Sequence, residues 1–234
     1  MVYKVTFTGI DGSGRSTTID IISRKLSGDG LSVVHPYRPG FADLPNKERE
    51  YFFRRGNDAV DRLHEIANEH NQRTIVGLIN VAYGVVQKFL ERYAVRKYDP
   101  DIILVSRNPV LDPSVYSAYY FPFTRGLSPR IRTKIASLIN HPRKEDLVLY
   151  MDIDPEIAHA RILERLEKEN GQVITHRRKF PHMHENPDDL RFLREQFEVT
   201  LDLLVREHGR SIERVDASKP QKEVVATILS MLDY

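Results

Sequence analysis

The amino-acid sequence predicts an α/β domain whose five-stranded parallel sheet is covered by helices on both faces. Short apolar runs, which are typical of buried strands, occur at residues 3–8, 31–35, 101–105, 147–151 and 212–215. Between them, apolar residues recur at the three- and four-residue spacing of amphipathic helices. Strands that alternate with helices form parallel sheets, and their crossover connections cover both faces.

The helices are predicted from this spacing and from residues that begin or end a helix. After the first strand, apolar residues indicate a helix over 16–26, which glycines end before the second strand. Residues 44–96 have no strand signal and predict two long helices, the second of which spans 73–96. The remaining helices are predicted to begin at Asp154-Pro155 and to span 188–208 and 220–232.

The composition fits one globular domain. The 234 residues are 41% hydrophobic and 29% charged, which allows a substantial single core. A formal charge of +2, with basic residues scattered along the chain, argues against a nucleic-acid binder. There is no cysteine, no run of eighteen apolar residues and no signal-peptide pattern. We therefore expect no disulfide, no membrane partner and a cytoplasmic location.

The chain contains no internal repeat, low-complexity segment or interdomain linker. Residues 1–234 are therefore predicted to form a single domain. Within it, residues 168–188 are rich in His, Arg, Asn and Pro and are predicted to form a mobile lid.

Residues 9–17 read GIDGSGRST and are predicted to bind the phosphates of a nucleoside triphosphate. Successive backbone N–H groups of a glycine-rich turn, together with the N-terminus of the next helix, bind phosphate oxygens. The Ser16 hydroxyl is the expected Mg²⁺ ligand. The alternative is a glycine-rich turn without a ligand, which the flanking strand and helix disfavour. The expected ATP-binding residues are Gly9, Asp11, Gly12, Ser13, Gly14, Arg15, Ser16 and Thr17.

Arg15 stands where the phosphate-loop pattern G-x-x-x-x-G-K-[ST] has lysine. Arginine keeps the positive charge, but its guanidinium is a planar fork rather than a compact point charge. We therefore expect triphosphate binding to persist and phosphoryl positioning to be imperfect. On this view, Arg15→Lys should leave ATP affinity within a few-fold and raise turnover.

With Asp11 inside the loop, this segment resembles that of the thymidylate kinase family, G-x-D-G-x-G-K-[ST]-T. The phosphate loop is the specific part of the resemblance. The other landmarks are individually weak but keep the family's order over nearly the whole chain. They are HPYR at 35–38, SRN at 106–108, YSAY at 116–119, LYMDIDP at 149–155 and VDAS at 215–218.

The resemblance implies a P-loop kinase of the nucleoside monophosphate type with a lid. Such an enzyme uses ATP and Mg²⁺ to phosphorylate a nucleoside monophosphate, here dTMP or a related deoxynucleotide. Asp11 would accept a hydrogen bond from the sugar 3′-hydroxyl, although a turn-stabilising aspartate is the alternative. The expected acceptor-binding residues are Asp11, Arg38, Tyr83, Arg107, Tyr116 and Tyr119.

Among these residues, Arg38 and Arg107 would clamp the acceptor phosphate, although each has the alternative of a surface arginine. Tyr116 and Tyr119 would line the base pocket or belong to the core. Tyr83 stands near the place where the family has the arginine of L-L-F-x-A-x-R.

The resemblance also implies that the lid supplies catalytic arginines. The candidates on the chain are Arg161, Arg165, Arg177 and Arg178, and a solvated surface cluster is the alternative for the last two. The expected catalytic set is Arg15, Arg107, Arg165, Arg177 and Arg178. The lid also holds His176, His182 and His184, which we interpret as solvated side chains rather than a metal site because no supporting carboxylate pattern accompanies them.

Two other functions stay open because the chain departs from the family. Ser106 replaces the aspartate that ends the third strand and helps to organise the magnesium site. A deoxynucleoside kinase would need a carboxylate at this position as a general base. A nucleotide-binding module with little turnover would tolerate both Ser106 and Arg15.

We also expect a homodimer through the helix at 73–96, because members of the family pair through this helix.

Overall fold

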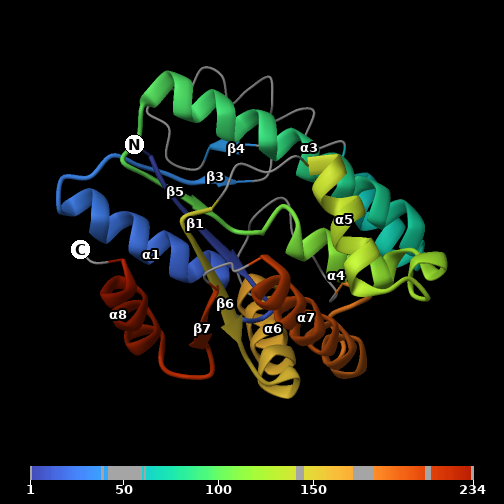
Figure 1. Ribbon diagram of the computed structural model, residues 1–234. Coiled ribbons are helices and arrows are strands. Elements are labelled where there is room, and N and C mark those ends of the chain that lie inside the picture. The colour runs from blue at the N-terminus through green and yellow to red at the C-terminus, as the bar shows by residue number, and fades with distance from the viewer. Residues whose placement is uncertain are drawn as a thin grey trace.

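The computed structural model describes residues 2–37, 40–41, 60, 62–140, 145–170, 182–208 and 212–232. At its centre lies a five-stranded parallel sheet with the strand order β2-β5-β1-β6-β7 (Figure 1). This confirms the predicted sheet. The strands are β1 (Tyr3–Thr8), β2 (Val33–Val34), β5 (Ile102–Val105), β6 (Leu147–Asp152) and β7 (Ile212–Asp216).

Strand β1 occupies the middle of the sheet, where it pairs with β5 on one side and β6 on the other. Val5 lies opposite Leu104 in one ladder and Leu147 in the other. Val5, Phe7 and Leu104 are fully buried, because helices cover both faces of these strands. The carboxyl ends of β1 and β5 therefore lie side by side at one edge of the sheet.

Helices pack on both faces of the sheet, as predicted (Figure 1). Helix α1 (Arg15–Gly28) contacts α8 (Gln221–Met231) on one face. On the other face, α4 contacts α3, α5 and α7, and α6 packs against α7. Their bounds are α3 (Arg73–Tyr98), α4 (Leu111–Tyr120), α5 (Pro129–Asn140), α6 (Pro155–Asn170) and α7 (Pro187–His208).

Some elements differ from the sequence prediction. Residues 62–69 are helical, while residues 44–59 and 61, in the region predicted for the first long helix, lie outside the described ones. A two-stranded antiparallel pair, β3 (Pro36–Tyr37) with β4 (Gly40–Phe41), was not predicted. Residues 111–140 form two helices joined through a short 3-10 turn at Pro122–Thr124, and these helices were not predicted from the sequence.

The segment predicted as a lid, 168–188, begins inside α6 and ends inside α7. Its residues 171–181 lie outside the described part of the chain. None of the described helices has the length and apolar character needed to cross a lipid bilayer.

Candidate active site

The phosphate loop connects the end of β1 to the start of α1 and requires glycine at specific positions. Gly9 and Gly12 have φ angles of 138° and 85°, which side chains rarely adopt. A Cβ on Gly9 would lie 2.7 Å from the Met151 carbonyl oxygen, and one on Gly12 would collide with the Ala158 carbonyl oxygen. The loop thus brings its backbone close to β6 and α6. Ser16 follows at the α1 N-terminus and is exposed to the cleft described next.

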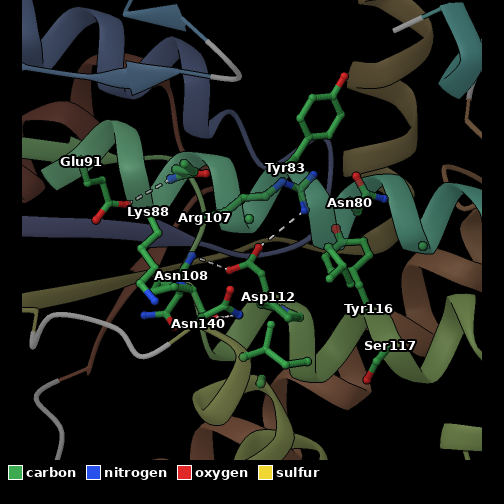
Figure 2. Close-up of a pocket in the computed structure, with 18 of the residues that line it drawn as sticks. Asn80, Tyr83, Lys88, Glu91, Arg107, Asn108, Asp112, Tyr116, Ser117 and Asn140 are labelled. Atoms are coloured by element: carbon green, nitrogen blue, oxygen red, sulfur yellow. Dashed lines mark hydrogen bonds and ion pairs between the residues drawn. The ribbon is translucent and has the colours of Figure 1, made fainter. Parts of the chain in front are cut away.

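Two adjoining hollows open beside this loop. The first, which we call the cleft, has a volume of about 220 Å³ and is lined by Asp11, Arg15, Ser16, Ser106, Arg165 and His184 among others. The second, which we call the groove, has a volume of about 310 Å³ and runs between α3, α4 and α5 (Figure 2). Arg107, Asn80 and Tyr120 line both hollows, so the two are neighbouring parts of one site.

The Asp11 carboxylate lies at the centre of a network of donors from four elements. Its Oδ1 accepts hydrogen bonds from Arg15 Nη2 at 3.0 Å and Arg107 Nη2 at 3.3 Å. Its Oδ2 accepts bonds from the Tyr116 hydroxyl at 3.0 Å and His184 Nε2 at 2.7 Å. A carboxylate offers about four acceptor positions, and all four are used here. A sugar hydroxyl would therefore have to displace one of these donors.

A second carboxylate, Asp112, is buried beside the first and was not foreseen from the sequence. It lies in the first turn of α4 and is 2% exposed. Its Oδ2 accepts bonds from the Thr8 hydroxyl at 2.6 Å and the Asn108 backbone N–H at 2.8 Å. Its Oδ1 lies 3.2 Å from Arg15 Nη1 and 3.6 Å from Arg107 Nη1. Dashed lines in Figure 2 join Asp112 to Arg107 and Asn108.

The two carboxyl groups respond differently to their surroundings. Burial by itself raises the pKa of Asp11, but the charge of Arg107, the hydrogen bond from His184 and the charge of Arg15 outweigh it and hold that pKa well below its usual value. For Asp112, burial dominates over the attraction of Arg15 and Arg107, so its pKa is raised. Burial alone would lower the pKa of Arg107, but the neighbouring Asp11 carboxylate raises the pKa of Arg107 overall. The network therefore keeps Asp11 ionised.

We expect Asp11→Asn to lower the free energy of unfolding by roughly 1.5–3 kcal/mol at neutral pH, because charge-assisted hydrogen bonds are lost. The native pKa of Asp11 lies below its unfolded value of 3.8. The charge therefore stabilises the fold above that value, and this stabilisation is lost as the pH falls through the native pKa. Urea unfolding of both proteins between pH 7 and pH 2 should show the gap closing below about pH 4. A gap that stays constant with pH would refute this assignment of the charge.

The structure changes the interpretation of two sequence-predicted groups. His184 is not a solvated lid residue: it is 4% exposed, and its Nδ1 lies 3.0 Å from the Tyr120 hydroxyl while its Nε2 contacts Asp11. Tyr116 does line the groove, but Tyr119 lines neither hollow. The Tyr119 hydroxyl instead donates to Asp189 of α7 at 3.0 Å. Tyr120 takes the place at the site that we expected for Tyr119.

The other predicted site residues are distributed as follows. Tyr83 is buried and lines the groove. Arg165 lines the cleft, where its Nη2 lies 3.4 Å from the buried Glu185 carboxylate. Arg161 instead donates to the carbonyl oxygens of Ala217 and Ser218 and lines neither hollow. Three predicted residues, Arg38, Arg177 and Arg178, and also His176, lie outside the described residues.

The fold and this site define the class of the protein. A parallel sheet with a phosphate loop between β1 and α1, and with an arginine directly after the neighbouring strand β5, is the arrangement of a P-loop kinase. Arg107 lies at the junction of the phosphate cleft and a groove of a size that holds small molecules. The cleft and the groove thus adjoin at Arg107.

Comparisons with known proteins agree with this class. A protein of Pyrobaculum aerophilum described as a probable thymidylate kinase is 26% identical over 232 residues, which are 97% of this chain and 95% of the relative. The thymidylate kinase of Thermosipho africanus is 28% identical over 178 residues, covering 73% of this chain and 77% of the relative. No protein-family model matches the chain.

Among solved structures, deoxyadenosine kinase from M. mycoides, with the products dCMP and a flexible dCDP bound, superposes with a TM-score of 0.63. It is 17% identical, and the match covers 98% of both chains. The same enzyme with bound dATP gives a TM-score of 0.59. The resemblance to thymidylate kinases is thus confirmed. The chain is similar to thymidylate kinases over most of its length, which agrees with phosphoryl transfer to a nucleotide, and the solved structures share its fold.

Proposed function

We propose that the protein transfers the γ-phosphoryl group of ATP to a nucleoside monophosphate, dTMP or a related deoxynucleotide. The observation that carries this proposal is the position of Arg107, which the end of β5 places at the junction of the cleft and the groove. A guanidinium there is suited to bind the acceptor phosphate in two-point contact while the loop binds the donor. Phosphoryl transfer depends mainly on such positioning and on charge neutralisation.

On the donor side, the residues from Gly9 to Thr17 would bind the triphosphate through backbone N–H groups. Ser16 fits the role of a Mg²⁺ ligand, because its side chain is exposed to the cleft at the first turn of α1. Mg²⁺ commonly keeps water and phosphate oxygens as its remaining ligands. When bound, it would neutralise phosphate charge. Arg165 would act from α6, and Arg177 and Arg178 remain candidates in a lid that we propose spans 168–188 of this single domain.

On the acceptor side, the nucleoside would occupy the groove. The amide side chains of Asn80 and Asn140 lie along it (Figure 2), and Gln87 also lines it among apolar residues. Amides both donate and accept hydrogen bonds and are therefore suited to the edge of a base. Tyr116 and Tyr83 also line the groove and supply aromatic surface.

A coupled assay of ADP release tests this function. It compares the common nucleoside monophosphates, the corresponding deoxynucleosides, and no acceptor, each with Mg²⁺ and ATP. We expect turnover with one or more monophosphates and only background release with nucleosides. Turnover with nucleosides alone would overturn the proposal.

A deoxynucleoside kinase is the second candidate, because the solved structures with this fold include deoxyadenosine kinase. Such an enzyme needs a base that takes a proton from the sugar hydroxyl. Ser106 cannot do this, and the Asp11 and Asp112 carboxylates are each engaged by two arginines. We therefore rank this candidate below monophosphate phosphorylation.

A cytoplasmic location remains a prediction.

We also propose a homodimer in which α3 meets its symmetry mate. The side chains of Leu78 and Phe89 on α3 are 58% and 61% exposed, which is unusual for large apolar residues. Light scattering at micromolar concentration should give about 54 kDa, twice the chain mass of 27.2 kDa. Leu78→Asp with Phe89→Asp should shift the mass to that of the monomer, whereas Phe123→Asp, outside α3, should not. A monomeric wild-type mass would contradict the proposal.

A further inference from the structure

We infer that Asp112 is the positioning residue that holds the guanidinium groups of Arg15 and Arg107 side by side, so that this phosphate loop requires arginine. The inference rests on the proposed function, because it assigns Arg15 to the donor phosphates and Arg107 to the acceptor phosphate.

The carboxylate of Asp112 is fixed by neutral donors on one oxygen and faces the two arginines with the other. Thr8 at the end of β1 and the Asn108 backbone N–H hold Oδ2 at 2.6 and 2.8 Å. Oδ1 is therefore aimed at Arg15 Nη1 and Arg107 Nη1, 3.2 and 3.6 Å away. Because Asp112 is 2% exposed, water screens these charges weakly.

Arg15 reaches two carboxylates at once, which only a forked side chain can do in this way. Its Nη2 contacts Asp11 at 3.0 Å, and its Nη1 contacts Asp112 at 3.2 Å. Lysine has a single nitrogen and would hold one of the two carboxylates less well. The other carboxylate would then lie buried with one cationic partner fewer, which is costly. The arginine in the loop and the aspartate on α4 are thus complementary.

Asp112 also keeps two like charges close together. Both guanidinium groups share Asp11 Oδ1, at 3.0 and 3.3 Å. Without Asp112, one carboxylate would face two cations, and their mutual repulsion would move them apart. Arg107 is the more exposed of the two, with a side chain 28% exposed against 7% for Arg15, and so it has more room to move. Loss of Asp112 should therefore disturb the acceptor side more than the donor side.

The position of Asp112 also accounts for Ser106, the residue that follows β5. Ser106 lines the cleft but carries no negative charge. Asp112 brings a carboxylate to the same sheet edge from α4, where it contacts Thr8 of β1. A second carboxylate, beside that of Asp11, is thus supplied to the site from the helix after the strand.

The first test is Asp112→Asn, which keeps the shape of the side chain and removes its charge. We expect kcat to fall roughly 10- to 100-fold and the acceptor KM to rise about 5-fold or more, while the ATP KM stays within about 3-fold. The matched control is Asp152→Asn. Asp152 is also held between two arginines, Arg194 and Arg214, but lines neither hollow. It should leave kcat and both KM values unchanged.

A second pair of variants remains informative if Asp112→Asn fails to fold. Thr8→Val removes the hydroxyl that orients Asp112 and is nearly isosteric. Thr6→Val is the control, because Thr6 lies on the same strand, is equally buried, and its hydroxyl has no hydrogen-bond partner among the described residues. We expect Thr8→Val to lower kcat and to raise the acceptor KM in the same direction as Asp112→Asn, and Thr6→Val to do neither.

The combination with Arg15→Lys measures the coupling directly. If Asp112 makes arginine necessary, Arg15→Lys should lower kcat by a clearly smaller factor in the Asp112→Asn background than in the wild type. With an active wild type, losses of kcat that simply add in the double variant would overturn the inference. So would a folded Asp112→Asn or a Thr8→Val whose kcat and acceptor KM are unchanged. Absence of wild-type turnover with every monophosphate would instead overturn the proposed function, and the inference with it.

Discussion

Arg107→Ala is expected to lower kcat with a nucleoside monophosphate by about 100- to 1,000-fold, since one prepositioned cation at the transferring group contributes on this scale. The side chain is held in place by Asp11 and Asp112 and lies over the Tyr116 ring, 5.0 Å from its centre. Arg107→Lys should recover only part of the loss, because an ammonium cannot make the two-point contact. Steady-state kinetics with varied acceptor would measure both effects.

Arg214 provides the matched control for this prediction. It also lies between two carboxylates, Asp152 and Glu198, and over an aromatic ring, that of Tyr150. It lines neither the cleft nor the groove. Arg214→Ala should therefore leave kcat and KM near wild-type values. An Arg107→Ala enzyme that keeps more than a tenth of wild-type kcat would mean that Arg107 does not bind the transferring group.

Arg15→Ala is expected to damage both stability and turnover. It removes a buried cation from Asp11 and Asp112, and breaking such pairs costs about 3–5 kcal/mol. Turnover should fall about 100-fold or more, because the phosphate loop loses its charge. The structure also reverses the sequence-based expectation for Arg15→Lys. We now expect that variant to lower kcat by about 10-fold, since lysine cannot hold both carboxylates.

Urea unfolding and steady-state kinetics of the two Arg15 variants test this account. Arg132→Lys is the control, because Arg132 is also buried but bonds to Leu127 and Gln196 away from the site. It should affect stability without changing kcat. A rise in kcat for Arg15→Lys would restore the view that arginine in this loop is a compromise.

Much of the fold could be predicted because its signals are local. Continuous apolar runs identify strands that are buried on both faces, and their alternation with helices predicts a parallel sheet. The order of the strands in the sheet was not predicted. The phosphate loop was equally clear from its glycines. At Gly9 and Gly12 the structure shows why glycine is needed, because a Cβ there would collide with neighbouring backbone. By contrast, the short β3–β4 pair contains two residues per strand, too few for any periodic pattern.

The missed site residues depend on contacts that are distant in the sequence. Asp112 reads locally as an acidic residue in the first turn of a helix, where it would be explained by the helix dipole. Only the fold brings it to Thr8, 104 positions earlier. His184 contacts Asp11 from 173 positions away. For the same reason, the sequence could not show that Arg15 lies between two carboxylates.

The most direct test of the central claim is to identify the phosphorylated product. ³¹P NMR of a reaction with Mg²⁺, ATP and a deoxynucleoside monophosphate would follow the acceptor phosphorus. We predict that the monophosphate resonance gives way to the coupled pair of a nucleoside diphosphate, and that this conversion is strongly reduced with Arg107→Ala. Conversion of ATP to ADP and inorganic phosphate while the monophosphate resonance persists would contradict the proposed function. So would phosphorylation of a deoxynucleoside, in a parallel reaction, in place of the monophosphate.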